Sequence, residues 1–213
     1  MKLYGYWRSS ATYRVRIVLA LKGIDYDYEP VNLLKGEQKN SAYLSKNPNG
    51  LVPTLVTDDG DALNQSLAIM EYLEESFPDP SILPGDLETR AKTRAIAATI
   101  ACEAQPLMNL RIQKYLKEEA SFDDNAVKDW LSRWPGGAMA AVEKMTAETG
   151  GDFCVGDTPT MADACLVPQW FGALRFGIDL SGLTRLKKIY EHCIALPAFE
   201  NAHPLNQPDA PKG

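Results

Sequence analysis

Two pairs of polar residues, Ser9-Ser10 and Gln65-Ser66, stand where strand-like segments of the sequence give way to helix-like segments. The first turn of a helix has unbonded backbone N–H groups and the positive end of the helix dipole, so it favours an anion such as a thiolate or a carboxylate. Serine is also a common helix cap with no further role. Two such starts in one small domain could hold the two ends of a small anionic ligand.

A third feature is the Val52-Pro53 bond, at the entrance of a strand-like segment, residues 51–57. Such bonds are cis in only about 5–6% of cases in folded proteins, so the local sequence favours a trans bond. A cis bond would turn the N–H and C=O of Val52 outward, where the pair could dock a peptide-like ligand.

The elements that must position these residues form two halves. The first half alternates strand and helix patterns, and nearly everything after Pro84 is helix-like. The predicted elements of the first half are a strand over 2–6, a helix over 11–22 closed by Gly23, a strand over 26–31, a short helix near Tyr43, strands over 51–57 and 62–63, and a helix over 65–75. The order is βαβ followed by ββα. A proline-rich stretch, 78–85, predicts an ordered linker, so we expect two domains, residues 1–82 and 87–213.

The second half reads as long helices over 90–119 and 125–148. Thr160 and Asp163 fit a variant capping box, which predicts a helix start just before an apolar run over 164–176. A further helix is expected over 183–193. The tail from His203, which contains three prolines, is expected to be irregular.

Composition excludes several classes of protein. The chain has 213 residues with 22 Lys and Arg against 28 Asp and Glu, a net charge of −6, which makes nucleic acid a poor candidate partner. No uncharged stretch approaches the roughly 20 residues that cross a bilayer, and the first eight residues lack the apolar core of a signal peptide. Two histidines and four cysteines without a C-x-x-C motif build no zinc spacing. We therefore expect a cytoplasmic, reduced, metal-free protein whose cysteines are small buried residues: Cys102, Cys154, Cys165 and Cys193.

Four segments in order resemble a known family. Residues 6–19, YWRSSATYRVRIVL, resemble the S-S-C-x-x-R-V-R-I-A-L signature of zeta-class glutathione transferases, the maleylacetoacetate isomerase family, with the maleylpyruvate isomerases as close relatives. Residues 47–55, 63–69 and 156–163 match further landmarks, and the likeness covers essentially the whole chain. The resemblance implies the cytosolic glutathione transferase fold, with a thioredoxin-like glutathione-binding domain and an all-helical substrate-binding domain. It also implies a homodimer with glutathione bound at the domain boundary.

The resemblance assigns roles around the first two features. Ser9 matches the serine that supports the glutathione thiolate, and Ser10 and Ala11 line the same turn. Val52 would pair its backbone with the cysteinyl unit of glutathione before a cis Pro53, which reverses the local expectation. Thiolate stabilisation would then come from the serine hydroxyl, two N–H groups and the helix dipole.

It assigns further glutathione contacts elsewhere. Gln65 and Ser66 would hold the γ-glutamyl carboxylate, and Gln38 matches a contact near the glycyl end. In the second half, residues 105–111 resemble the family's Q-P-x-x-N-L segment, so these residues are also expected at the glutathione site: Gln105, Asn109, Leu110 and Arg111. Gln105 and Asn109 are four residues apart, on one face of a helix that Pro106 should kink, although ordinary contact between helices would explain such a face equally well.

Three arginines bear on the substrate. Arg8 lies beside Ser9, Arg175 matches an arginine that family members direct into the site, and Arg111 resembles a carboxylate-binding position of the maleylpyruvate isomerases. A lone arginine is usually solvated or salt-bridged. Three in one pocket would indicate a dicarboxylic substrate, because guanidinium groups match carboxylates.

One position departs from the family signature, since Ala11 stands where a cysteine is common. None of the four cysteines lies in the first domain, so none can replace that thiol. The departure argues against thiol-transferase, dehydroascorbate reductase and reductive dehalogenase activity. It leaves cis–trans isomerisation possible, because glutathione supplies the nucleophile.

The leading hypothesis is therefore a glutathione-dependent isomerase that converts maleylacetoacetate to fumarylacetoacetate, or maleylpyruvate to fumarylpyruvate. Such a step belongs late in the catabolism of aromatic rings, including those of tyrosine and phenylalanine. Ser9, Ser10 and Arg8 are the expected catalytic residues. Two alternatives stay open: a general transferase that conjugates glutathione to electrophiles, and a non-enzymatic transferase-like binding module.

Overall fold

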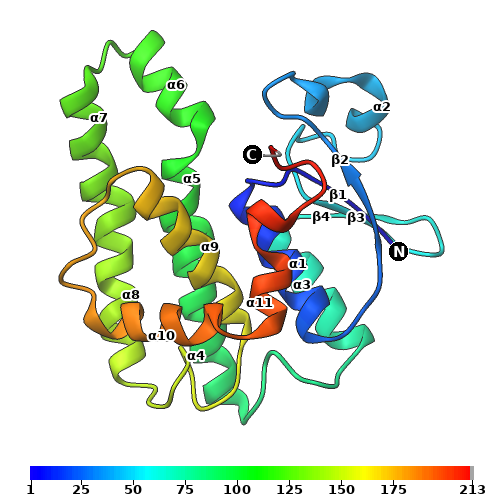
Figure 1. Ribbon diagram of the computed structural model, residues 1–213, viewed down its shortest axis with the longest axis vertical. Coiled ribbons are helices and arrows are strands. Elements are labelled where there is room, and N and C mark those ends of the chain that lie inside the picture. Colours follow the sequence, from blue (N-terminus) through cyan, green and yellow to red (C-terminus); the bar gives the residue numbers. More distant parts are fainter. Residues whose placement is uncertain (212–213) are drawn as a thin grey trace. The chain divides into compact units, whose positions relative to one another are not determined.

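The computed structural model of the chain describes residues 1–211 and divides into two compact units (Figure 1). The first unit comprises Met1–Ile82 and the chain from Ala195 onward, and the second comprises Leu83–Ile194. The candidate sites expected near Ser9, Val52 and Gln65 therefore belong to one unit.

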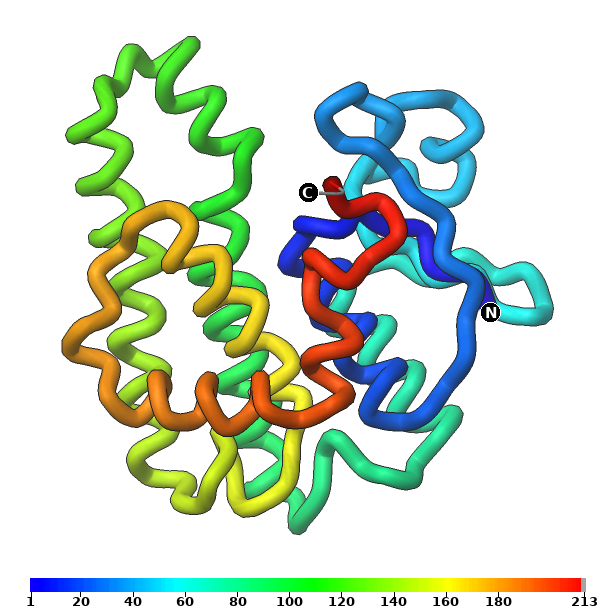
Figure 2. The backbone as a smooth tube through the Cα atoms, viewed as in Figure 1, coloured from blue at the N-terminus to red at the C-terminus, as the bar shows by residue number. Residues whose placement is uncertain are grey.

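The division differs from the expected one at the carboxyl end of the chain. Residues from Ala195 onward belong with the first unit, where α11 (Pro197–Ala202) packs against α1 (Ser10–Leu21) (Figure 2). The buried Tyr13 donates from its hydroxyl to the carbonyl of the buried Phe199 at 3.4 Å. The final segment thus completes the core around α1, and the tail that the sequence predicts as irregular contains a 3₁₀ turn, Pro204–Asn206.

A four-stranded sheet in the order β2-β1-β3-β4 forms the first unit. The strands are β1 (Lys2–Gly5), β2 (Asp27–Pro30), β3 (Thr54–Val56) and β4 (Ala62–Asn64). β1 pairs parallel with β2 and antiparallel with β3, which pairs antiparallel with β4. Leu3 lies opposite Leu55 and both are fully buried, so the centre of the sheet is apolar. With α1, α2 (Ser41–Leu44) and α3 (Ser66–Ser76), this is the thioredoxin-like fold that the resemblance implies.

A buried lysine joins α1 to α3. Lys22 is the C-cap of α1, and Gly23 follows with φ 63, a left-handed conformation that glycine adopts without strain. The Lys22 ammonium donates to Glu74 Oε2 at 2.8 Å and to the carbonyls of Phe77 at 2.6 Å and Pro80 at 2.9 Å. The ion pair therefore fixes both helices and the start of the linker.

The second unit is all-helical, as expected. Its helices are α4 (Leu87–Ala98), α5 (Gln105–Met108), α6 (Leu110–Glu118), α7 (Asp124–Leu131), α8 (Gly137–Ala147), α9 (Met161–Arg175) and α10 (Thr184–Ile194). The predicted long helices over 90–119 and 125–148 are interrupted by π-helical segments, η2 (Thr99–Ala104) and η3 (Ser132–Gly136). Pro106 follows the first and Pro135 lies within the second, and proline lacks the N–H that a regular α-helix needs.

The predicted capping box at the start of α9 is confirmed. Asp163 Oδ2 accepts the N–H of Thr160 at 2.8 Å and its hydroxyl at 2.7 Å, and Oδ1 accepts the N–H of Cys154 at 2.8 Å. Burial raises the pKa of Asp163 above its ordinary value, although these hydrogen bonds act in the opposite direction. Three cysteines are buried as expected, but Cys102 is exposed on the interrupted helix, so that expectation is wrong for one thiol.

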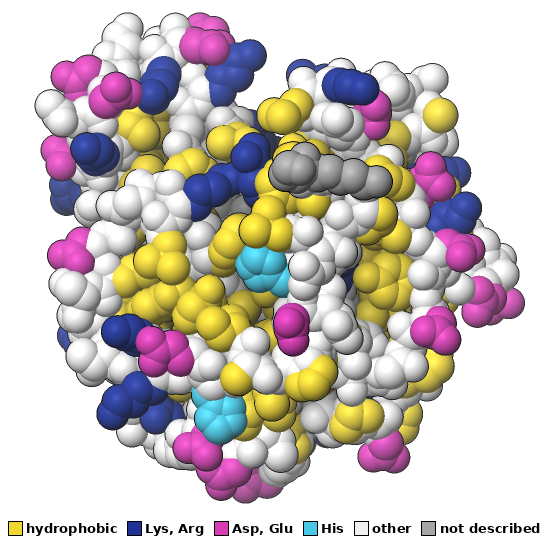
Figure 3. All heavy atoms as spheres, in the orientation of Figure 1, with side chains coloured by type: hydrophobic (Ala, Val, Ile, Leu, Met, Phe, Trp, Pro, Cys, Tyr) yellow, Lys and Arg dark blue, Asp and Glu magenta, His cyan; other side chains and the backbone are white. Residues whose placement is uncertain are grey.

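The surface mixes charges of both signs. On the face in Figure 3, Asp and Glu side chains are interspersed with Lys and Arg side chains, and no broad basic area covers it. Every helix among residues 1–211 is too short or too polar to cross a bilayer.

Candidate active site

The start of α1 leaves several hydrogen-bond donors available to a ligand. Ser9 is the N-cap, and its Oγ accepts the N–H of Thr12 at 3.2 Å while its carbonyl accepts the N–H of Tyr13 at 2.9 Å. The N–H groups of Ser10 and Ala11 have no hydrogen-bond partner within residues 1–211. The cap uses the Ser9 oxygen only as an acceptor, so its hydroxyl proton remains free to be donated. Ser9 can therefore cap the helix and still stabilise an anion beside it.

The Val52-Pro53 bond is cis, as the resemblance implies and contrary to the local expectation. The carbonyl of Leu51 accepts the Tyr43 hydroxyl at 2.6 Å and Asn47 Nδ2 at 2.7 Å, which fixes the chain just before Val52. The Val52 side chain is buried, yet its backbone N–H and C=O make no hydrogen bond within the described chain. This pair is therefore held in place and open to a peptide-like ligand.

Gln65 and Ser66 begin α3 in an unusual conformation. Gln65 has φ 71 and ψ 117, a region that side-chain-bearing residues rarely occupy, and its side chain makes no cap hydrogen bond. Such strain persists only where the surroundings impose it, and it is typical of functional sites. Ser66 is buried, and its Oγ accepts Arg14 Nη1 at 3.1 Å. A guanidinium behind a helix start adds positive charge where an anion would bind.

Arg14 and Arg16 are functional candidates that the sequence reasoning missed. Arg14 connects the start of α3 to α1, and Arg16 donates from Nη2 to the carbonyl of Trp7 at 2.9 Å, just before Ser9. Both are buried in a helix whose other buried residues are mainly apolar. The signal was present, because a buried guanidinium requires partners and two of them within an apolar helix call for a structural explanation.

Gln38 lies in a 3₁₀ turn, Glu37–Lys39, and its amide oxygen is buried without a hydrogen-bond partner in the described part of the chain. Buried polar atoms are almost always satisfied, so this oxygen calls for a donor from outside the chain. An amide N–H of a peptide-like ligand has the required chemistry.

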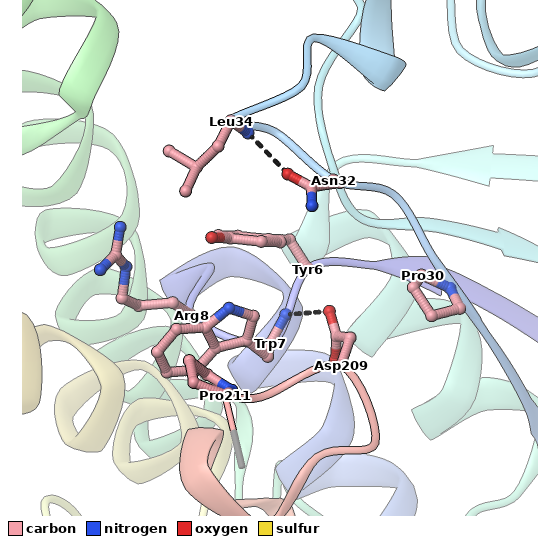
Figure 4. A pocket seen from close by; sticks show the side chains of 8 residues that line it. All are labelled: Tyr6, Trp7, Arg8, Pro30, Asn32, Leu34, Asp209 and Pro211. Carbon is pink, nitrogen blue, oxygen red and sulfur yellow. Dashed lines mark hydrogen bonds between the residues drawn. The ribbon is translucent and has the colours of Figure 1, made fainter. Parts of the chain in front are cut away.

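A cavity of about 340 Å³ adjoins the turn between β1 and α1 (Figure 4). Its lining residues come from the first unit and include Tyr6, Trp7, Arg8, Leu34 and Asp209. The Arg8 guanidinium lies 5.3 Å from the centre of the Trp7 ring. Arg8 therefore combines a cationic group, an aromatic support and a position next to Ser9.

The other two candidate arginines belong to the second unit. Arg111 is exposed in the first turn of α6, and Arg175 is exposed at the end of α9 with its guanidinium 4.3 Å from the centre of the Phe176 ring. Their convergence with Arg8 stays a prediction.

The expectation of one helical face through Gln105 and Asn109 is wrong. Gln105 is the first residue of α5, whereas Asn109 has ψ 143, an extended conformation, and is the N-cap of α6. Asn109 Oδ1 accepts the N–H of Arg111 at 3.1 Å, and Leu110 is exposed. The helix therefore ends before Asn109 and a new helix begins after it. Pro106 does not merely kink one continuous helix.

Comparison with known proteins agrees with this geometry. Residues 8–76 match the glutathione S-transferase, N-terminal domain family. The chain is 46% identical to maleylacetoacetate isomerase of Pseudomonas aeruginosa over 99% of each chain, and 41% identical to maleylpyruvate isomerase of a Ralstonia species over 99% and 100% of the two chains. A crystal structure of maleylacetoacetate isomerase from Methylobacterium extorquens, with bound malonate and glutathione, matches over 100% of both chains with a TM-score of 0.94 and 39% identity. The chain therefore belongs to the family of zeta-class glutathione transferases and maleylacetoacetate or maleylpyruvate isomerases.

Proposed function

We propose that this protein is a glutathione-dependent cis–trans isomerase of a maleyl-type dicarboxylate, with maleylacetoacetate and maleylpyruvate as the candidate substrates. The observation that carries the proposal is the start of α1, where the Ser9 hydroxyl proton and the N–H groups of Ser10 and Ala11 are all available to a thiolate. Relatives named for either substrate share more than 40% of their residues with this chain, so the choice between the two substrates is open.

The open polar groups of the first unit fit glutathione. The backbone of Val52 would pair with the cysteinyl unit, as one strand pairs with another. Ser66 and the start of α3, with Arg14 behind them, would hold the γ-glutamyl carboxylate, and the Gln38 oxygen would accept the N–H of the glycyl unit. In the second unit, Gln105 and the Asn109–Arg111 segment would complete the site. The relative from Methylobacterium extorquens supports this assignment, because its crystal structure holds glutathione together with malonate, a dicarboxylate.

When bound, glutathione supplies the nucleophile that adds reversibly to the cis double bond, so that rotation becomes possible. Ser9, Ser10 and Ala11 would hold the sulfur as a thiolate, because three donors and the helix dipole favour its charged form. Arg8, Arg111 and Arg175 would bind the substrate carboxylates and stabilise the negative charge that develops on the substrate. The turn carries Ala11 where the family signature set out above has cysteine, so the chain offers no thiol there for disulfide chemistry.

The direct test offers each maleyl compound to the purified protein with and without glutathione, and follows the loss of the cis isomer spectroscopically. We expect glutathione-dependent conversion of at least one compound and no net consumption of glutathione. S-methylglutathione, which has no free thiol, should not support the reaction. Absence of glutathione-dependent conversion of both compounds would refute the proposal.

Two further properties belong to this proposal. Thiol chemistry requires a reducing compartment, so we propose that the protein acts in the cytoplasm. We also propose a homodimer, on the strength of the resemblance set out above. Light scattering coupled to size-exclusion chromatography should give a mass of twice the 23.5 kDa of one chain.

A further inference from the structure

The carboxyl-terminal segment reaches the turn that carries Ser9. Asp209 Oδ2 accepts the backbone N–H of Trp7 at 2.9 Å (Figure 4). The same oxygen accepts the hydroxyl of Tyr28 at 3.4 Å. The first hydrogen bond joins residues 202 positions apart in the sequence. It links the last described part of the chain to the loop between β1 and α1.

The other backbone group of Trp7 is held as well. Its carbonyl accepts Arg16 Nη2 at 2.9 Å, and the same guanidinium donates from Nε to the carbonyl of Ala202 at 3.0 Å. Arg16 therefore contacts both the turn and the carboxyl-terminal segment. The carboxyl-terminal segment therefore binds the N–H of Trp7 directly, through Asp209. It also holds Arg16, the arginine that binds the C=O of Trp7.

The charges around this contact reinforce it. Arg16 is almost fully buried, and burial lowers its pKa, while Tyr28, Tyr26 and Asp209 act in the opposite direction. Burial raises the pKa of Tyr28, and the neighbouring Asp209 raises it further, so this hydroxyl stays protonated and donates to the carboxylate. A buried guanidinium needs negative charge and acceptors nearby, and the carboxyl-terminal segment provides both.

We propose that Asp209 is a positioning residue for the thiolate site, and that the carboxyl-terminal segment holds the turn from Trp7 to Ser9 in its active geometry. Ser9 donates its N–H to the carbonyl of Tyr6 at 2.9 Å, so residues 6–9 form a tight turn. Fixing both polar groups of Trp7 fixes the direction of the Ser9 hydroxyl and of the two N–H groups that follow it. The inference rests on the proposed role of Ser9.

The test measures the thiol pKa of bound glutathione by ultraviolet difference titration, without any maleyl substrate. Asp209→Ala removes the acceptor for the Trp7 N–H, and we expect it to raise that pKa by about one unit, which lowers the thiolate fraction about tenfold on the acidic side. Asp209→Asn keeps an oxygen that can accept the same N–H, so it should shift the pKa less. S-methylglutathione has no thiol to stabilise, and its affinity should change less than about twofold in both variants.

The matched control is Asp86→Ala, which removes another carboxylate that accepts a backbone N–H, that of Thr89, at 2.9 Å. It should leave the thiol pKa unchanged. An unchanged thiol pKa in Asp209→Ala would overturn the inference. An equal loss of affinity for glutathione and S-methylglutathione at every pH would also overturn it, because a merely structural role of Asp209 predicts that result. The same titration of the unaltered protein, together with the isomerisation assay, separates the proposed reaction from the proposed role of Asp209. A lowered pKa of the bound thiol without maleyl isomerisation refutes the proposed reaction alone, whereas failure to bind glutathione refutes both proposals.

Discussion

Substitution of Ser9 separates the two roles that the structure gives this residue. Its Oγ accepts the Thr12 N–H at 3.2 Å as a helix cap, and its proton is available to a thiolate. Ser9→Ala removes both functions. Loss of a serine cap costs about 1 kcal/mol of unfolding free energy. For a chain of this size, that corresponds to a fall in Tm of about 2–4 °C.

The loss of activity should be larger than this loss of stability explains. Removing one donor to a developing or resident anion typically lowers kcat by about 10²-fold or more. We therefore expect Ser9→Ala to lower the isomerisation rate at least 10²-fold and to move the acidic limb of its pH profile to higher pH, while the protein stays folded at the assay temperature.

Two further variants of Ser9 distinguish the loss of the helix cap from the loss of the hydrogen-bond donor. Ser9→Thr keeps the cap and the donor, so it should retain most of the activity. Ser9→Asp keeps the cap acceptor but offers no proton and adds negative charge, so it should be as stable as the parent and nearly inactive. The assays are thermal unfolding and initial isomerisation rates across pH. Substantial activity in Ser9→Asp, or a rate in Ser9→Ala that falls only as far as its folded fraction, would refute the reasoning.

Four further predictions test other parts of the structure. Arg8→Ala and Arg175→Ala should lower isomerisation of a maleyl dicarboxylate far more than conjugation of an uncharged electrophile, and equal losses in parallel steady-state assays would favour a general transferase. Lys22→Met should lower the unfolding free energy by about 3 kcal/mol in urea titrations, because it removes the cationic partner of the buried Glu74 carboxylate. Adding Glu74→Gln should restore part of the loss. Burial raises the pKa of Glu74, but hydrogen bonds, led by the one from Lys22, outweigh this effect and lower the net pKa. The ionised Glu74 therefore stabilises the fold fully above its ordinary pKa, and this stabilisation is lost as the pH falls through the pKa of the folded state. Glu74→Gln should flatten this part of the plot of unfolding free energy against pH, below about pH 4.5. Cys102 should react rapidly with a thiol reagent in the folded protein and the other three cysteines only after denaturation, and more than one rapid equivalent would contradict their burial.

Local patterns predicted the fold where local chemistry decides it. The alternation of strands and helices in the first half, Gly23 after α1 and the capping box of Thr160 and Asp163 all depend on residues a few positions apart. The breaks at Asn109 and the π-helical segments were missed, because a proline in a helical pattern shows where regular hydrogen bonding must fail but not how the chain accommodates it.

The residues of the candidate site also differ in whether the sequence alone could predict their roles. Ser9 and Gln65 lie at helix starts that the local sequence pattern predicted, and the structure shows both. The cis bond after Val52 followed from the family resemblance alone, because the local sequence favours a trans bond. The arginine at position 16 was a visible signal in the sequence, but its partners and the role of Asp209 could not be predicted, because they depend on tertiary contacts with Trp7. Helical periodicity predicts that a side chain faces the core, but it does not predict which carbonyl group accepts a hydrogen bond from that side chain.

The return of the carboxyl-terminal segment to the first unit also sets an order of events during synthesis. Arg16 is translated before the second unit, whereas the carbonyl of Ala202 that accepts its Nε is translated only after the whole of that unit. A nascent chain that has reached Ile194 lacks this partner of Arg16, and it lacks Asp209, the acceptor of the Trp7 N–H. The hydrogen bonds that hold the turn before Ser9 can therefore form only after the second unit has been synthesised, so the first unit is completed after it.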